Sequence, residues 1–268
     1  MTGDAFGGSI AAVYDRYLVP MVFEPYAAEL ARRISALRPA RVLEIAAGTG
    51  VLTERLAESL PSGSTIVATD LSQPMLDRAA LRLGASGVRF EAADAQSLPF
   101  ADGEFDVAVC QFGVMFVPDK ATAYAEMARV LRSGGHALFT IWDRLATSPI
   151  PHAVAEAVAA RFPADPPRFL SRVPYGYHDV AGVRVALGNA GFGTVSAETL
   201  TLTSTAPSAR DGAIGFCQGT PLRTEIETRD PDGLGAATTA AEATLIARLG
   251  PGPITTTMTA TLITATAT

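Results

Sequence analysis

The chain has 268 residues, of which 48% are hydrophobic and 18% charged, a balance typical of a folded globular protein rather than a disordered one. Its 27 acidic residues outnumber its 21 lysines and arginines, so no basic stripe is available to neutralise a row of phosphates, and we expect no nucleic-acid partner. The length favours one large core with elaborations, since single cores stop growing at roughly 250 to 300 residues.

The N-terminal residues 1–10 lack the positive segment and the apolar run of a secretory signal. Charged residues, glycine or proline interrupt every hydrophobic segment before it reaches the ~18 to 20 apolar residues that span a bilayer. We therefore predict a cytoplasmic protein with no membrane span. Cys110 and Cys217 are too few for a disulfide framework or a zinc site, so we expect two buried thiols and no metal.

Two helices are predicted ahead of the core, over residues 10–18 and 24–37, the second with Tyr26, Leu30 and Ile34 on one face. We expect residues 1–38 to form a helical cap over a cofactor cleft.

Residues 39–144 alternate short β-branched runs with amphipathic stretches, which is the pattern of strands and crossover helices in a parallel sheet. Strands are predicted over residues 41–46, 65–69, 88–92, 105–111 and 136–142. Helices are predicted between them, including one over 121–131. The order of these elements predicts a doubly wound α/β sheet.

The remaining chain divides into a lid and a segment that completes the sheet. Residues 145–177 are rich in Pro, Arg and aromatics, and predict an irregular lid, or substrate segment, with one short helix over 153–161. Residues 178–268 predict helices over 178–189 and 232–249 with strands over 194–203 and 257–266. The sequence between 206 and 253 is otherwise uninformative.

The most informative motif is Val42-Leu43-Glu44-Ile45-Ala46-Ala47-Gly48-Thr49-Gly50, a strand that ends in an acid and turns through glycines into a helix. Glycines let a ligand approach the main chain, and the free N–H groups of the helix favour a carboxylate or a phosphate. Asp70 ends the next strand about twenty residues on, where an acid commonly receives ribose hydroxyls. Asp94, after the third strand, could accept an amine hydrogen. Together they indicate an adenosine-containing ligand.

Two alternative functions remain open at this point. A nicotinamide-dependent oxidoreductase would share the glycine turn and Asp70, but its fingerprint requires a small third glycine where this chain has Thr53. A non-catalytic module that binds an adenosine ligand would fit if Ala46 reflected lost turnover.

Five motifs in order resemble the class I S-adenosylmethionine-dependent methyltransferases, in particular the branch that is similar to the ubiquinone and menaquinone biosynthesis C-methyltransferases. The resemblance covers roughly residues 10–142. It rests on the segments Leu43-Glu44-Ile45-Ala46-Ala47-Gly48-Thr49-Gly50, Asp70-Leu71-Ser72-Gln73-Pro74-Met75, Ala93-Asp94-Ala95-Gln96-Ser97-Leu98-Pro99-Phe100, Phe105-Asp106-Val107 and Val130-Leu131-Arg132-Ser133-Gly134-Gly135.

The resemblance implies a seven-stranded Rossmann-like sheet with the last strand antiparallel, S-adenosylmethionine as co-substrate and a small-molecule methyl acceptor. It also implies that Gly48 and Gly50 border the methionine part, that Asp70 holds the ribose, and that Asp94 meets the adenine amino group. The full set of cofactor-binding residues that it implies is Tyr14, Tyr17, Glu44, Ala46, Gly48, Gly50, Asp70, Leu71, Met75, Asp94, Ala95 and Gln111. In this set Leu71 and Met75 flank the adenine, and Ala95 meets its ring edge. Glu44 supports the glycine loop and the amino group of the donor. Gln111 faces the cleft near the donor, and Tyr14 or Tyr17 closes over the donor.

Two residues depart from the family pattern: Ala46 replaces a glycine and Ser133 replaces a proline. The donor sulfonium is already activated, so we expect positioning to supply most of the catalysis, with a base needed only if the acceptor must lose a proton. His152, in the predicted lid, is the candidate base. The expected partner is a small-molecule methyl acceptor. A homodimer is possible as the oligomeric state. Acceptor contacts are hypothesised for the aromatic residues Phe162, Phe169, Tyr175 and Tyr177.

Overall fold

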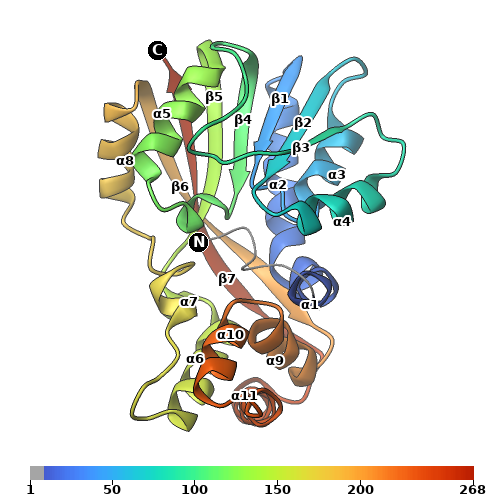
Figure 1. Ribbon diagram of the computed structural model, residues 1–268, viewed down its shortest axis with the longest axis vertical. Helices are drawn as coiled ribbons and strands as arrows, with labels where there is room; N and C mark the ends of the chain where they lie inside the picture. The colour runs from blue at the N-terminus through green and yellow to red at the C-terminus, as the bar shows by residue number, and fades with distance from the viewer. Residues whose placement is uncertain (1–8) are drawn as a thin grey trace.

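The computed structural model describes residues 9–268, and its centre is a seven-stranded sheet of order β3-β2-β1-β4-β5-β7-β6 (Figure 1). Strands β1 (Arg41–Ile45), β2 (Thr65–Asp70), β3 (Arg89–Ala92), β4 (Phe105–Gln111) and β5 (Leu131–Trp142) pair in parallel. Strand β7 (Ile254–Ala267) is antiparallel to both β5 and β6 (Phe192–Ala206). The predicted fold, including the antiparallel last strand, is confirmed.

Each face of the sheet is covered by helices. Val42 and Ile66 point toward α2 (Glu24–Ala36) and α3 (Val51–Ser59), with which they form one apolar cluster. Leu43 and Val67 point to the other face, where α5 (Lys120–Val130) and α8 (Val180–Asn189) pack. Because side chains alternate along a strand and both faces are covered, the central strands are almost continuously apolar.

A second, helical lobe lies below the sheet in Figure 1. It contains α6 (Pro149–Arg161), α7 (Phe169–Arg172), α9 (Ala209–Gln218), α10 (Leu222–Arg229) and α11 (Leu234–Leu249). Strands β6 and β7 extend from the sheet into this lobe, and α11 packs against α6 and α9. Segments before and after β6 therefore build one helical lobe around the far ends of these two long strands.

The N-terminal prediction of two separate helices is wrong. The chain forms one helical run from residue 9 to 36: α1 (Ser9–Val13), a π-helical stretch η2 (Tyr14–Phe23) and α2. Pro20, which lacks an N–H, lies inside η2, and the helical run continues through it. Buried side chains on either side, among them Leu18 and Val22, hold the run together across this point.

Other boundaries differ by extension. Helix α6 begins at Pro149, four residues ahead of the prediction, because proline suits the first turn of a helix. Strand β5 begins at residue 131, and β6 and β7 are longer than expected. Helices α9 and α10 were not predicted. Helix α4 (Gln73–Leu83) and the short helices η3 (Val114–Phe116) and η4 (Leu145–Thr147) complete the fold.

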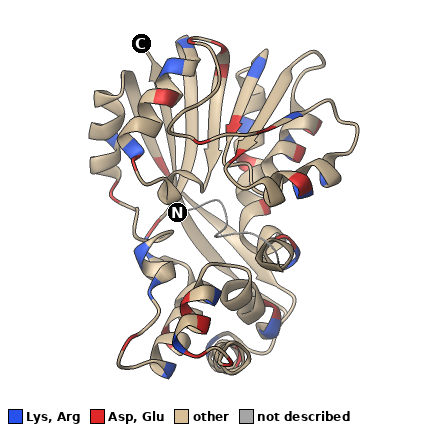
Figure 2. Ribbon diagram, in the orientation of Figure 1, with Lys and Arg blue, Asp and Glu red and all other residues tan. Residues whose placement is uncertain are grey.

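Charged residues lie mainly on the outer helices, with both signs interspersed, and few fall on the strands (Figure 2). Within the described residues 9–268, no helix is both long and apolar enough to cross a membrane.

Candidate active site

A cavity of about 400 Å³ opens at the carboxyl ends of the central strands, between the sheet, the helical run η2 and the helical lobe. It lies where the strand order reverses between β1 and β4, the position at which open α/β sheets bind ligands. The lining residues divide into two halves. A polar half lies over β1, β2 and the segment after β3, and an aromatic half lies over β4, β5 and the lobe.

The polar half is organised by Asp70 at the end of β2. Its carboxylate oxygens accept hydrogen bonds from the backbone N–H groups of Gly48 and Ser72, each at 2.8 Å. Burial raises the pKa of Asp70, and these backbone bonds oppose the rise. Gly48 has φ +58°, which glycine adopts without strain, so the loop is fixed with its main chain toward the cavity.

Glu44 lies behind this loop rather than in the cavity wall. It is 1% exposed, and its Oε2 accepts a hydrogen bond from Thr53 Oγ1 at 2.7 Å. Burial raises the pKa of Glu44 to about 8, with the hydrogen bond from Thr53 opposing the rise and the charge of Asp70 adding to it. The hydrogen bond joins β1 to the first turn of α3, next to the glycine loop.

Gly50 also stands outside the cavity wall, and its role is packing. It has φ +83° at the start of α3, and a Cβ there would lie 2.8 Å from Ala79 Cβ on α4. A glycine is therefore required for the close approach of α3 and α4, whereas contact of Gly50 with a ligand stays a prediction.

Helix α4 and the segment after β3 form the side of the polar half. Leu71, 51% exposed, and Met75, 4% exposed, both line the cavity, as does Ala95. The Asp94 carboxylate accepts hydrogen bonds from the backbone N–H of Gln96 at 2.9 Å and from its Nε2 at 3.0 Å. The residues proposed for the adenine therefore share one end of the cavity.

Tyr14 from η2 closes this half, whereas Tyr17 does not. The Tyr14 hydroxyl lies 3.9 Å from the point where a Cβ on Gly48 would stand. Burial raises the pKa of Tyr14, and the nearby carboxylates of Asp70 and Asp15 add to the effect. Tyr17 instead packs its Cβ toward Gly215 on α9, and Arg16 lies 5.2 Å over its ring.

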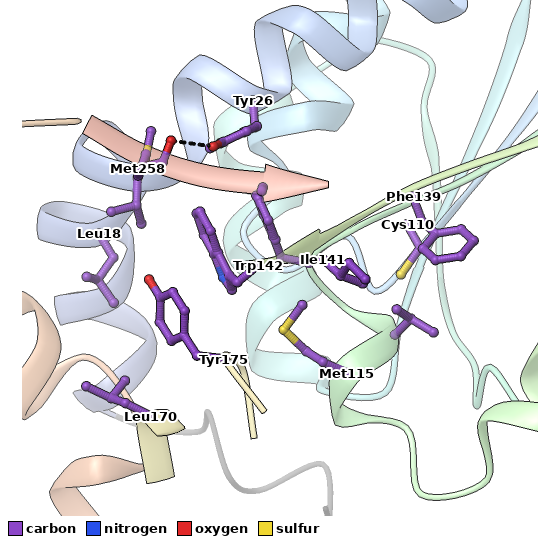
Figure 3. Packing of buried hydrophobic residues seen from close by; sticks show 14 of the residues in the cluster. Leu18, Tyr26, Cys110, Met115, Phe139, Ile141, Trp142, Leu170, Tyr175 and Met258 are labelled. Atoms are coloured by element: carbon purple, nitrogen blue, oxygen red, sulfur yellow. Dashed lines mark hydrogen bonds between the residues drawn. The ribbon is translucent and has the colours of Figure 1, made fainter. Parts of the chain in front are cut away.

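The aromatic half is built around Trp142 at the end of β5. Phe112 stacks on the indole with ring centroids 3.7 Å apart and planes 7° apart, and Tyr175 lies on the indole at 5.6 Å. Figure 3 shows Tyr175 facing Trp142, with Leu18 and Leu170 nearby. Phe23, Phe116, Phe169 and Phe216 complete the wall. Among the described lining residues, only Asp70 and Asp94 are charged, and both lie in the polar half.

Two non-glycine residues at the floor of the cavity adopt left-handed backbone conformations. Ala46 has φ +57° and Phe112 has φ +53°, which is uncommon for any residue with a Cβ and more so for an aromatic one. A Cβ on Gly113 would lie 2.4 Å from Ala46 Cβ and 2.7 Å from Cys110 Sγ. The methyl of Ala46, the departure from the family pattern, therefore requires a glycine at 113. Such strain is common at functional sites.

Gln111 ends β4 at the border of the two halves. Its Nε2 donates a hydrogen bond to the backbone carbonyl of Phe23 at 2.8 Å. Its Oε1 is buried and has no hydrogen-bond partner among the described residues.

His152, the candidate base, does not line the cavity. It lies on α6 with its side chain 38% exposed, and its Nε2 is 3.9 Å from the Glu156 carboxylate. Of the residues hypothesised to contact the acceptor, Phe169 and Tyr175 line the cavity, whereas Phe162 and Tyr177 do not. The Tyr177 hydroxyl forms a hydrogen bond with the Tyr124 hydroxyl at 2.9 Å. No metal-binding group of His, Cys, Asp or Glu occurs within residues 9–268.

Several lining residues were missed by sequence reasoning, including Phe23, Phe112, Trp142 and Phe216. Phe112 and Trp142 each stand at or just beyond a strand's carboxyl end, the edge where ligands bind, and this position was an available signal. Phe216 lies on a helix that no pattern indicated.

Comparison with known proteins agrees with this geometry. A family model described as a methyltransferase domain matches residues 43–139. An uncharacterized protein of Mycobacterium tuberculosis (strain ATCC 25618 / H37Rv) is 42% identical over 97 residues, 35% of this chain and 34% of that protein. The ubiquinone/menaquinone biosynthesis C-methyltransferase UbiE of Ectopseudomonas mendocina is 41% identical over 110 residues, 39% of this chain and 43% of that protein. The chain spans less than half the length of either relative.

The solved structure of the YcgJ protein from Bacillus subtilis superposes with a TM-score of 0.59, covering 91% of this chain and 98% of that one at 19% identity, and shows the shared fold. Residues 43–139 therefore match a methyltransferase domain, and the fold around them is that of the solved structure. The resemblance to the S-adenosylmethionine-dependent methyltransferases is confirmed over this region.

Proposed function

We propose that the protein transfers a methyl group from S-adenosylmethionine to a small, largely apolar acceptor. The observation that carries the proposal is the divided cavity: its polar half is formed by residues of the family motifs, and its aromatic half is continuous with it. Support also comes from the relative whose printed name is a quinone-biosynthesis C-methyltransferase, which makes a quinone-like acceptor a reasonable first candidate.

The donor would lie across the polar half. Asp70 would accept the ribose hydroxyls, with its carboxylate already held by Gly48 and Ser72. Met75 and Ala95 would pack on the adenine, and Tyr14 would cover the methionine part. S-adenosylmethionine supplies a methyl group on positively charged sulfur, activated for transfer.

The chain's own contribution would then be alignment and exclusion of water. An aromatic wall without charge desolvates the acceptor and holds a flat molecule in one orientation, and such positioning can be worth roughly 7 to 11 kcal/mol. No histidine lines the cavity among the described residues, so the proposal assigns no general base.

The two alternatives are less well supported. A nicotinamide-dependent oxidoreductase needs a glycine where this chain has Thr53. Thr53 is fully buried and donates a hydrogen bond to Glu44, so the position does not fit the dinucleotide pattern. A purely donor-binding module would not need the aromatic half. A cytoplasmic location, the absence of nucleic acid and a homodimer stay predictions.

The test is methyl transfer. The protein is incubated with S-adenosylmethionine labelled in its methyl group and an organic-solvent extract of cells, and the label is followed into the extractable fraction. We expect S-adenosylhomocysteine and a labelled small molecule in equal amounts, reduced at least tenfold with Asp70→Asn, and at the wild-type level with Asp77→Asn, an exposed acid on α4. Label in protein or nucleic acid instead would contradict a small-molecule acceptor.

A further inference from the structure

The orientation of the Gln111 amide is fixed by its neighbour. The carbonyl of Phe23 can only accept a hydrogen bond, so the group 2.8 Å from it must be the NH₂ of Gln111. The amide oxygen therefore points away from η2. This oxygen is buried and has no partner among the described residues, an arrangement that costs free energy unless a ligand supplies a proton donor.

The other polar groups in the cavity wall are largely engaged. Thr220 Oγ1 donates to the Phe216 carbonyl at 2.7 Å, and Gln96 Oε1 accepts from the Asp119 N–H at 3.1 Å. Of the described lining residues, only Ser72 and Gln111 have a buried side-chain oxygen without a partner. Ser72 lies at the start of α4 in the polar half, so Gln111 is the unsatisfied group that borders the aromatic half.

The position of Gln111 in the sheet places it on the acceptor side. It pairs in register with Thr140 of β5, and the next residue, Phe112, stacks on Trp142. Most of the other residues expected to hold the donor come from β1, β2, α4 and the segment after β3, with Tyr14 from η2. Gln111 was expected to face the donor, and it lies at the border of the two halves, beside the stacked aromatic rings.

We propose that Gln111 is a specificity-determining residue: its Oε1 accepts a hydrogen bond from a hydroxyl or N–H group of the methyl acceptor. The inference rests on the proposed function and deepens it. An acceptor that carries a proton donor on an otherwise apolar, flat body satisfies the buried oxygen. An analogue in which that hydrogen is replaced by a methyl group leaves it unsatisfied and is rejected. Because the amide is not basic, Gln111 orients the acceptor and takes no proton.

The test measures binding of matched probes to the full chain saturated with S-adenosylhomocysteine, by calorimetry. The probes are 2-naphthol and 2-methoxynaphthalene, which share a flat apolar body and differ in the hydroxyl hydrogen. We expect 2-naphthol to bind about tenfold more tightly to the wild-type protein, which corresponds to about 1.4 kcal/mol. With Gln111→Met, which keeps the length of the side chain but has no amide, the ratio should fall to about one.

Two controls separate this role from others. Gln96→Met removes a second cavity glutamine whose oxygen is already bonded, so the tenfold ratio should persist. The affinity of Gln111→Met for S-adenosylhomocysteine should stay within about threefold of wild type, which a residue of the donor site would not show. The wild-type ratio is measured on unaltered protein and stands even if the variant fails to fold.

Equal binding of the two probes to the wild-type protein, binding of neither at millimolar concentration, or an unchanged ratio in Gln111→Met would each overturn the assignment. So would a tenfold loss of S-adenosylhomocysteine affinity in that variant. Failure of the wild-type protein to bind S-adenosylhomocysteine would instead refute the proposed function, and with it the basis of this inference.

Discussion

Glu44 lies buried at the carboxyl end of β1, with Thr53 donating a hydrogen bond to it and Asp70 adding unfavourable negative charge. Burial raises its pKa to about 8 from an ordinary value of 4.5. Between these two values the folded protein holds a proton that the unfolded chain has lost. Glu44 therefore makes its full contribution to the free energy of unfolding below pH 4.5. This contribution is lost as the pH rises through 8.

Glu44→Gln removes this titration while keeping an oxygen for the hydrogen bond from Thr53. We expect the variant and the wild-type protein to unfold at similar temperatures at pH 5, and the variant to be more stable at pH 8, by on the order of 4 kcal/mol. Thermal unfolding at both pH values measures this. Glu58→Gln, at an exposed position of α3, should follow the wild-type protein. A Glu44→Gln variant that is less stable at pH 8 would show that the buried carboxyl is ionised and needed.

Ala46 carries the cost of a left-handed conformation that glycine adopts freely. Ala46→Gly should raise the free energy of unfolding by about 0.5 to 1 kcal/mol. Gly113→Ala should lower it by about 2 kcal/mol or more, because its Cβ would overlap that of Ala46.

The double variant, Ala46→Gly with Gly113→Ala, tests whether overlap of the two Cβ atoms causes the loss of stability in Gly113→Ala. Removing the Ala46 methyl should recover part of the loss from Gly113→Ala, though not all of it, because Cys110 Sγ still lies close. Chemical unfolding of the four proteins gives this coupling energy. Strict additivity of the two changes would mean that the two side chains do not compete for the same space.

At the scale of elements, an ion pair links the N-terminal helical run to the polar half of the cavity. Asp15 in η2 pairs with Arg82 on α4, which also donates from Nε to the carbonyl of Thr49 in the glycine loop at 3.0 Å. The link joins three segments of the polar half and brings Tyr14 to Asp70.

Asp15→Asn should loosen this cover. We expect faster hydrogen exchange in residues 9–23, with exchange in α2 unchanged, since the pair is only partly buried and worth about 1 kcal/mol or less. Mass spectrometry of peptic fragments measures this, and Glu29→Gln, an acid on α2, is the matched control. Equal exchange of residues 9–23 in Asp15→Asn and the wild-type protein would show that apolar packing alone holds the run.

The core elements could be predicted from the sequence because their patterns are local. The strand over residues 41–45 is buried at all but its first position and contains three apolar residues. After Asp70, Pro74 in the first turn favours the helix, although the Ser72 side chain forms no cap hydrogen bond. The polar half of the site followed from these same motifs, and Asp70, Gly48 and Met75 do line one cavity.

The helical lobe and the aromatic half could not be predicted in the same way. Helix α10 has no strong apolar stripe of its own and is buried through Leu222 and Ile226 against neighbours distant in sequence. The helical run through Pro20 is likewise decided by tertiary packing. Trp142 ends a predicted strand and Phe112 follows another, but the stacking of their rings depends on the register of β4 with β5.

At the scale of the whole molecule, the sheet and the helical lobe share one apolar core. A single buried cluster runs from Tyr124 and Phe139 beside the sheet to Ala237 and Leu245 in α11, and Tyr26 ties α2 to β7 through the Met258 carbonyl at 2.9 Å (Figure 3).

Such continuity predicts cooperative unfolding. The near-ultraviolet signal, to which the single Trp142 between the lobes contributes, and the far-ultraviolet signal of the helices should change in one coincident thermal transition. Two separate transitions would mean that the helical lobe unfolds independently of the sheet.

The central claim is that the polar half of the cavity binds S-adenosylmethionine, and the most direct measurement is calorimetric titration of the full chain with S-adenosylhomocysteine and, separately, with NAD. The account predicts saturable, one-to-one binding of S-adenosylhomocysteine, weakened at least tenfold in Asp70→Asn and unchanged in Asp77→Asn, with no binding of NAD. Binding of NAD in place of S-adenosylhomocysteine, or of neither ligand, would contradict it.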